Sequence, residues 1–434
     1  MKIFSSFCTA RMLLPAQRGE VTVGMTLAIM LSSLASLGVT SAIIYNVNKN
    51  EYREQALKDS VAISLRFLIG MPFVIVIVYF LLGRYAHNQV FKGIADAVIL
   101  SSCVQCVISL FHGFVTDALH ALMDFRTRNN AFVLPYLVQV GVLFSVWVTH
   151  RGMSVGHIIS SVQIMYLQNW AILLAAAYSF FVLRKKHKIV YHWQLPQDWK
   201  RDYLHYGLKS CLAKLAQNLN NRLDALLINT LLNSTLTGLY AIATSLAELL
   251  LFVPSSIAAV LQPKIAGASE EEKRRLPGLM LGTACTLTFG GILLAFIFMP
   301  WFIPWYYGKH NAEAVPPALW LLPGMLGYAI AQVLMALMAG LGKPQVSAHA
   351  TMSGLVATVI LDFMLIPRFH IVGAAVASSI AYWVSALTVL YLYRLHTKEP
   401  LSTLFTSSVR EPREWLKGKV KARKVSSASS NIGQ

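Results

Sequence analysis

Long apolar runs separated by short polar segments dominate the chain. A hydrocarbon core about 30 Å thick requires roughly 20 apolar residues per helix. Within it every backbone polar group needs an internal partner, so only helices or closed barrels can span it. The runs are continuous rather than alternating, which predicts helices. We expect about eleven spanning helices, at 22–44, 61–83, 93–113, 131–149, 160–182, 204–231, 236–262, 277–299, 317–340, 345–366 and 371–393.

Composition supports the same class of protein. Hydrophobic residue types make up 56% of the 434 residues and charged types only 13%. Soluble domains carry about 25% charged residues. No segment between the runs is long enough to fold as a domain. We therefore predict an all-α integral membrane protein, a polytopic bundle of about eleven transmembrane helices in two pseudo-symmetric lobes.

The basic residues predict an orientation rather than a nucleic-acid partner. The net charge is +18, but most Lys and Arg residues lie in short loops and in the tail. With the C-terminus in the cytoplasm, 25 of them fall in cytoplasmic segments and 8 in external ones. This excess is what the positive-inside rule produces. We expect a multi-pass protein of the plasma membrane, with a basic tail attracted to anionic lipids.

An internal repeat indicates two lobes. Gly19 and the nine residues after it resemble the segment that begins at Gly238, at an offset of 219 residues. Two weaker matches, at Ala121 and Val155, have nearly the same offset. A duplication of this kind is a transporter architecture, with the substrate site near the membrane midplane. The predicted parts are an N-terminal lobe at 1–182, a basic cytoplasmic loop at 183–203, a C-terminal lobe of six helices at 204–394 and a basic tail at 395–434.

The predicted helix at 204–231 carries an unusual number of polar residues. Charged groups deep in a bilayer are costly and usually face a cavity. Side chains spaced three and four apart share one helix face, which here must avoid lipid and could line a substrate cavity. This stripe consists of Lys214, Gln217, Asn218, Asn221 and Arg222.

Two carboxylates near this stripe have two interpretations. Glu248 lies near the middle of the next predicted helix, at a depth similar to that of Lys214, and Asp224 follows the stripe. They form structural pairs, or they take part in ion coupling, with Glu248 taking up and releasing a proton. Enzyme signatures are absent from the sequence, so we expect no catalytic residues, metal or cofactor.

Several segments resemble polysaccharide exporters and flippases of the multidrug/oligosaccharidyl-lipid/polysaccharide superfamily. Tyr206–Ser210, Asn221–Asp224 and Gly238–Tyr240 resemble the start of that family's second lobe, and Ala339–Pro344 and Leu365–Arg368 its last helices. Leu13–Glu20 resembles the loop that follows the family's first helix. The resemblance covers nearly the whole chain. It implies twelve helices, so this sequence departs from the family by lacking most of the first.

The resemblance implies a flippase for an undecaprenyl-pyrophosphate-linked oligosaccharide, working by alternating access in a bacterial inner membrane, with polysaccharide polymerase machinery as a further partner. Lys214 and Arg222 would bind the pyrophosphate, and Asn218 and Asn221 the sugar hydroxyls. The alternatives are a multidrug or small-cation antiporter of the same superfamily, a membrane-embedded polysaccharide polymerase or ligase, and an inactive truncated copy. A cationic stripe favours an anionic substrate.

Overall fold

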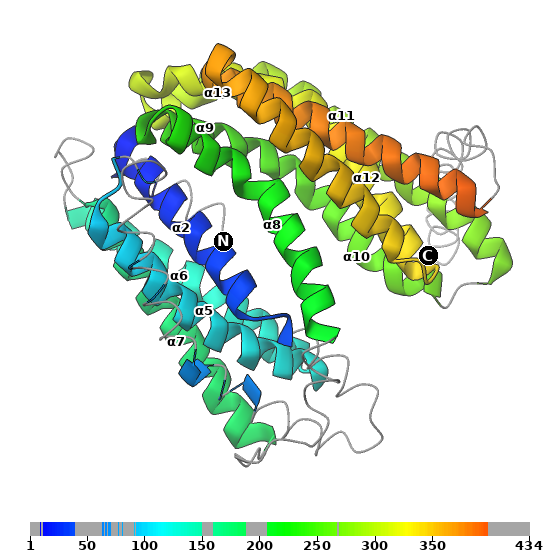
Figure 1. Ribbon diagram of the computed structural model, residues 1–434, viewed down its shortest axis with the longest axis horizontal. Coiled ribbons are helices and arrows are strands. Elements are labelled where there is room, and N and C mark those ends of the chain that lie inside the picture. The colour runs from blue at the N-terminus through cyan, green and yellow to red at the C-terminus, as the bar shows by residue number, and fades with distance from the viewer. Residues whose placement is uncertain are drawn as a thin grey trace, which may run out of the picture. The chain divides into compact units, whose positions relative to one another are not determined.

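The computed structural model describes residues 9, 12–39, 63, 64, 66, 68–70, 77, 80, 91, 93–149, 159–187, 206–266 and 269–397. Regular structure in these ranges is helical throughout (Figure 1). Seven of the described helices are long and apolar enough to cross a membrane. The prediction of an all-α integral membrane fold is therefore confirmed. Most of the predicted helix at 61–83 and nearly all of the basic tail lie outside the described residues.

The chain divides into two compact units. The first contains the described residues within Met1–Ser245, with Pro304–Ala314 and Ile366–Ile371. The second contains Leu246–Ile303, Val315–Leu365 and the described residues that follow Val372. The predicted lobe boundaries at 183–203 and the missing first helix stay predictions. The described helices of the first unit include α2 (Pro15–Ala35), α5 (Asp96–Ala121), α6 (Phe125–Thr149), α7 (Ser161–His187), α8 (Tyr206–Leu231), most of α9 (Ser234–Ala247) and the 3₁₀ helix η4 (Lys309–Ala314).

In the first unit, α5 is the central helix. It packs against α2 and α7, while α6 packs against α7 and α8 against α2. Val98, Leu119 and Ile164 are completely buried among apolar neighbours. In contrast, α6 keeps large apolar side chains such as Phe144 and Trp147 exposed. A helix with this exposed apolar surface is suited to lipid rather than to water.

The second unit contains η3 (Glu248–Leu251), α10 (Phe252–Ala266), most of α11 (Glu270–Tyr307), α12 (Val315–Gly340) and most of α13 (Gln345–Thr397). A reciprocal cap starts α11, because the Ser269 backbone N–H donates to Glu272 Oε2 and the Glu272 N–H donates to Ser269 Oγ. Non-helical torsions at His370 (φ 53°, ψ −134°) divide α13 into two helices. This break agrees with the separate helices predicted at 345–366 and 371–393.

Several predicted boundaries are corrected by the structure, including the end of α2, at Ala35 rather than 44, the start of α6, at Phe125 rather than 131, and the bounds of α11, Glu270–Tyr307 rather than 277–299. α2 begins at Pro15 rather than near residue 22, because a proline suits the first helical position, where no N–H is needed. The single helix predicted at 236–262 is interrupted by the 3₁₀ segment η3. Pro254 explains this interruption, since it lacks the N–H that would bond to the carbonyl four residues earlier, at Leu250.

Candidate functional site

The predicted polar stripe lies on α8 of the first unit. Gln217, Asn218, Asn221 and Arg222 are all partly exposed. The Gln217 amide donates to Asn221 Oδ1 at 3.3 Å, and the Asn218 amide donates to Ser33 Oγ of α2 at 2.6 Å. The amides thus make one hydrogen bond within α8 and one across to α2.

Of the two basic residues in the stripe, the structure describes the side chain of Arg222 but not that of Lys214. Arg222 is close enough to the Tyr136 hydroxyl of α6 for an electrostatic interaction. Lys214 lies within α8, but its side chain is outside the described residues. A possible pair between Lys214 and Glu248 therefore stays a prediction, as does the role of the stripe in substrate binding. What the described residues establish is a guanidinium group and three amides along one side of α8.

Asp224 lies near the C-terminal end of α8 and is buried. Its carboxylate accepts a hydrogen bond from Tyr240 Oη of α9 at 2.5 Å and another from the Ala225 backbone N–H at 2.8 Å. Because Tyr240 is also almost completely buried, this pair joins the end of α8 to α9. These contacts favour the structural interpretation of Asp224 over ion coupling.

Glu248 begins the 3₁₀ segment η3 in the second unit and is partly buried. It lies close enough to Tyr328 of α12 to interact electrostatically, and the Tyr328 ring meets Tyr382 of α13 edge-on, with centroids 5.1 Å apart. Short 3₁₀ stretches inside a longer helix often mark hinges. Glu248 thus lies near the Tyr328 side chain, at the point where the helix is interrupted.

The starts of α2 and α9 make a very close backbone contact in the first unit. A Cβ atom on Gly19 would lie 1.8 Å from the Ser234 carbonyl oxygen, and one on Gly238 would lie 1.8 Å from the Pro15 carbonyl oxygen. Only glycine permits this approach. Both pairs of residues are related by the same offset of 219 positions, which supports the internal repeat found in the sequence.

Sequence reasoning missed Arg18, the residue beside this crossing. Its side chain is 7% exposed, and Nη2 donates to the Ala241 carbonyl and to Ser245 Oγ, each at 3.3 Å. The guanidinium carbon also lies 5.7 Å from the centre of the Tyr307 ring. Those partners are more than 220 residues away in sequence, so the sequence alone does not reveal them. The one feature that could have drawn attention to Arg18 is its position directly before a glycine of the internal repeat.

Metal chemistry finds no support in the described part of the chain. No group of three His, Cys, Asp or Glu side chains there is arranged to hold a metal ion. The polar side of α8 offers hydrogen-bonding groups and a positive charge for recognition.

Comparison with known proteins identifies a family that this chain matches over more than half of its length. A family model described as "Polysaccharide biosynthesis protein" matches residues 1–269. No curated protein matches the sequence at a significant level.

Several solved structures share the fold at low sequence identity. An inward-facing multidrug resistance transporter of the MATE family, within the MOP superfamily, has a TM-score of 0.71 at 12% identity, with 94% of this chain and 96% of that chain covered. The lipid II flippase MurJ in an inward closed conformation has a TM-score of 0.72 at 14% identity, covering 94% and 87%. A MOP superfamily transporter from Pyrococcus furiosus, noted for the reversed polarity of its binding pocket, has a TM-score of 0.54 at 14% identity, covering 92% and 96%.

Proposed function

Because the chain belongs to the polysaccharide biosynthesis protein family, we propose that it is a flippase for a polyprenyl-pyrophosphate-linked oligosaccharide. The cargo moves from the cytoplasmic to the outer leaflet of a bacterial inner membrane. A fold shared with a lipid II flippase and with other MOP transporters supports this proposal. The activity that we propose is transport rather than covalent chemistry.

The observation that carries the proposal is the polar side of α8. Arg222 is partly exposed there, within a bundle whose other helices are strongly apolar. A cation at this depth is stable only in a wet cavity or beside an anion. Guanidinium groups match phosphate oxygens in a bidentate geometry, and amides can bond to sugar hydroxyls. Arg222 and Lys214 would bind the pyrophosphate, and Gln217, Asn218 and Asn221 would contact the sugars.

Reconstitution tests the proposal directly. A fluorescent polyprenyl-pyrophosphate oligosaccharide is placed in one leaflet of proteoliposomes, and its arrival in the other leaflet is followed with and without a proton gradient. Flipping above the rate of protein-free vesicles is expected. A gradient-dependent rate that Glu248→Gln abolishes would assign ion coupling to Glu248, whereas unchanged coupling would leave it a structural role.

A pair of arginine variants tests the site. Hydrogen bonds to charged groups contribute about 1.5–3 kcal/mol, so Arg222→Gln should slow flipping roughly tenfold or more. Arg368→Gln is the matched control, because it removes an exposed cation that lies in α13 and not in the stripe on α8. Equal rates for both variants would contradict the pyrophosphate role. Efflux of a cationic dye in place of lipid flipping would support the multidrug antiporter instead.

A further inference from the structure

A cluster of cations lies where α6 begins and α7 ends, away from the polar side of α8. Both ends belong to the side that the charge distribution predicts to be cytoplasmic. We refer to this cluster as the basic rim. Its members are Arg126, Arg128, Arg184, Lys185 and Lys186.

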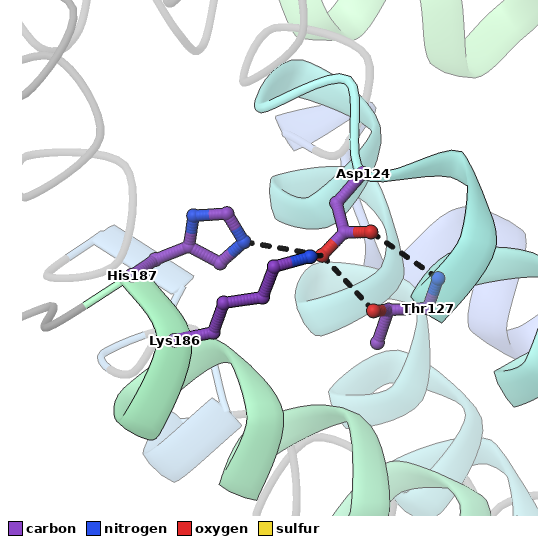
Figure 2. A network of polar contacts seen from close by, with 4 residues as sticks. All are labelled: Asp124, Thr127, Lys186 and His187. Atoms are coloured by element: carbon purple, nitrogen blue, oxygen red, sulfur yellow. Dashed lines mark hydrogen bonds and ion pairs between the residues drawn. The ribbon is translucent and has the colours of Figure 1, made fainter.

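A buried carboxylate holds these two helix ends together (Figure 2). Asp124 Oδ2 accepts from Lys186 Nζ at 2.7 Å and from Thr127 Oγ1 at 2.9 Å, and it lies 3.2 Å from His187 Nε2. Its Oδ1 accepts from the Thr127 N–H at 3.3 Å, which satisfies a backbone donor in the first turn of α6. The basic residues of α6 and of α7 are thereby brought side by side.

The Asp124 carboxylate is already committed to these partners. Burial opposes its ionisation, but the hydrogen bonds from Lys186, His187 and Thr127 outweigh burial and hold the pKa of Asp124 well below its ordinary value. Asp124 is therefore ionised at neutral pH, and Lys186 neutralises it. The remaining members of the basic rim must find their counter-charge elsewhere.

Few carboxylates are available to supply it. Within the described residues of α5, α6 and α7, the other acidic side chains are Asp96, at the opposite end of α5, and Asp117. Arg126, Arg184 and Lys185 are exposed. Arg128 is partly buried, and its Nε has no hydrogen-bond partner among the described residues. The helix ends thus have a local excess of positive charge.

Exposed apolar side chains adjoin these cations. Met123 is 59% exposed and Phe181 60% exposed, and Phe125 and Phe132 are exposed as well. The guanidinium carbon of Arg128 lies 5.1 Å from the Phe132 ring centre, and Lys185 Nζ lies 5.7 Å from that of Phe181. Phe132 is two helical turns beyond Phe125, so it lies about 10 Å farther along α6. Such rings are stable against acyl chains, with the cations at the level of the lipid phosphates.

We propose that the basic rim is a binding site for the phosphate headgroup of an anionic phospholipid, whose acyl chains lie along Phe132 and Phe181. Arg126, Arg128 and Arg184 supply guanidinium forks for the phosphate oxygens, and Lys185 adds a point charge. The Asp124 network positions the two halves of the site. This site consists of residues other than those of the basic tail, and it does not depend on which cargo the protein carries.

Native mass spectrometry of the full chain tests this site with dioleoylphosphatidylglycerol as the probe and dioleoylphosphatidylcholine as the neutral comparison. The test variant combines Arg126→Gln, Arg128→Gln, Arg184→Gln and Lys185→Gln. Removing several cations at a membrane surface should weaken phosphatidylglycerol binding by roughly tenfold or more. The matched control removes four cations from the tail, through Lys417→Gln, Lys419→Gln, Lys421→Gln and Lys424→Gln, and should retain the tightest bound lipid. Equal loss in both variants, no loss in the rim variant, or equal binding of the neutral lipid would overturn the proposal.

A second measurement uses the unaltered protein, so it is decisive even if the rim variant does not fold. A phosphatidylglycerol analogue with a photoactivatable acyl chain is bound, irradiated and mapped by peptide mass spectrometry. Labelling should concentrate in 123–132 and 178–187. Labelling spread evenly over the other lipid-facing helices would rule out a specific site.

Discussion

The starts of α2 and α9 have the same backbone contact and very different side chains. At the shared position, Gly19 and Gly238 each admit a carbonyl oxygen of the other helix. One residue earlier, α2 has Arg18, whereas α9 has Thr237, whose hydroxyl donates to the Asn233 carbonyl of its own helix. Both side chains are buried. The repeat thus retains its packing while the polarity of the two copies has diverged.

This divergence separates two kinds of constraint. The constraint at the crossing of α2 and α9 is steric, because the carbonyl oxygen of one helix occupies the volume that a Cβ methyl group on the other helix would need. The neighbouring position is a matter of chemistry, because a buried cation needs acceptors and Arg18 finds them in α9. A side chain that departs from the symmetry of the fold is a candidate for function, since packing alone would be served by a small residue.

The largest effect is expected from filling the crossing. Gly19→Ala and Gly238→Ala each place a methyl group on a backbone carbonyl, which only a shift of a helix can relieve. We expect each to lower the free energy of unfolding by about 1–3 kcal/mol or more. Thermal unfolding of the purified protein at a fixed scan rate, followed by tryptophan fluorescence, measures the change.

The control for the crossing is Gly141→Ala in α6, where an added Cβ would meet nothing within 4 Å. This variant should be neutral or slightly stabilising, because alanine favours the helix. If all three variants unfold at the same temperature, the close contact between α2 and α9 does not contribute to stability.

An intermediate effect is expected from substituting Arg18 and Thr237, the matching residues that differ between the two copies. Arg18→Ala removes two hydrogen bonds from a charged donor and the packing of a buried side chain, which should cost about 2–3 kcal/mol. Thr237→Ala removes one local hydrogen bond and should cost about 1 kcal/mol. The same unfolding assay compares them. If Thr237→Ala lowers the free energy of unfolding more than Arg18→Ala does, the hydrogen-bond acceptors around Arg18 do not offset the cost of burying its charge.

The smallest effect is expected at the caps. Asn233 Oδ1 accepts from the Leu236 N–H at 2.9 Å at the start of α9, whereas Leu14 at the matching position of α2 has no side-chain acceptor. Asn233→Ala should cost about 1 kcal/mol and Leu14→Asn should gain about 0.5 kcal/mol. If the free energy of unfolding changes in the same direction in both variants, the N-cap positions of α2 and α9 are not equivalent.

Much of the fold could be predicted from the sequence because hydropathy alone identifies spanning helices. The separate helices at 345–366 and 371–393 were recognisable from length, because one spanning helix needs roughly 20 residues. The start of α2 was missed because Pro15 lies among residues that also suit a loop. The interruption at Glu248–Leu251 was only partly foreseeable, since Pro254 indicates a kink but not the exact residues that absorb it.

The candidate site was predictable in its local part and not in its distant contacts. Spacing alone places Gln217, Asn218 and Asn221 on one side of α8, and the Gln217 amide donates to Asn221 one turn later. The partners of Arg18 and the binding of Asp224 by Tyr240 depend on how helices pack. No periodicity in a single sequence encodes those distances.

The crossing of α2 and α9 behaves like the isologous interface of a homodimer enclosed within one chain. Gly19 of the first copy contacts the Ser234 carbonyl of the second, and Gly238 of the second copy contacts the Pro15 carbonyl of the first. This reciprocal pairing is what defines an isologous interface. A gene duplication that fused two such subunits would have inherited this contact twice over. Neither glycine codon can then drift alone, because a side chain at either one displaces the carbonyl of the other copy. The neighbouring positions, Arg18 and Thr237, have diverged in chemistry, while the two glycines have stayed the same.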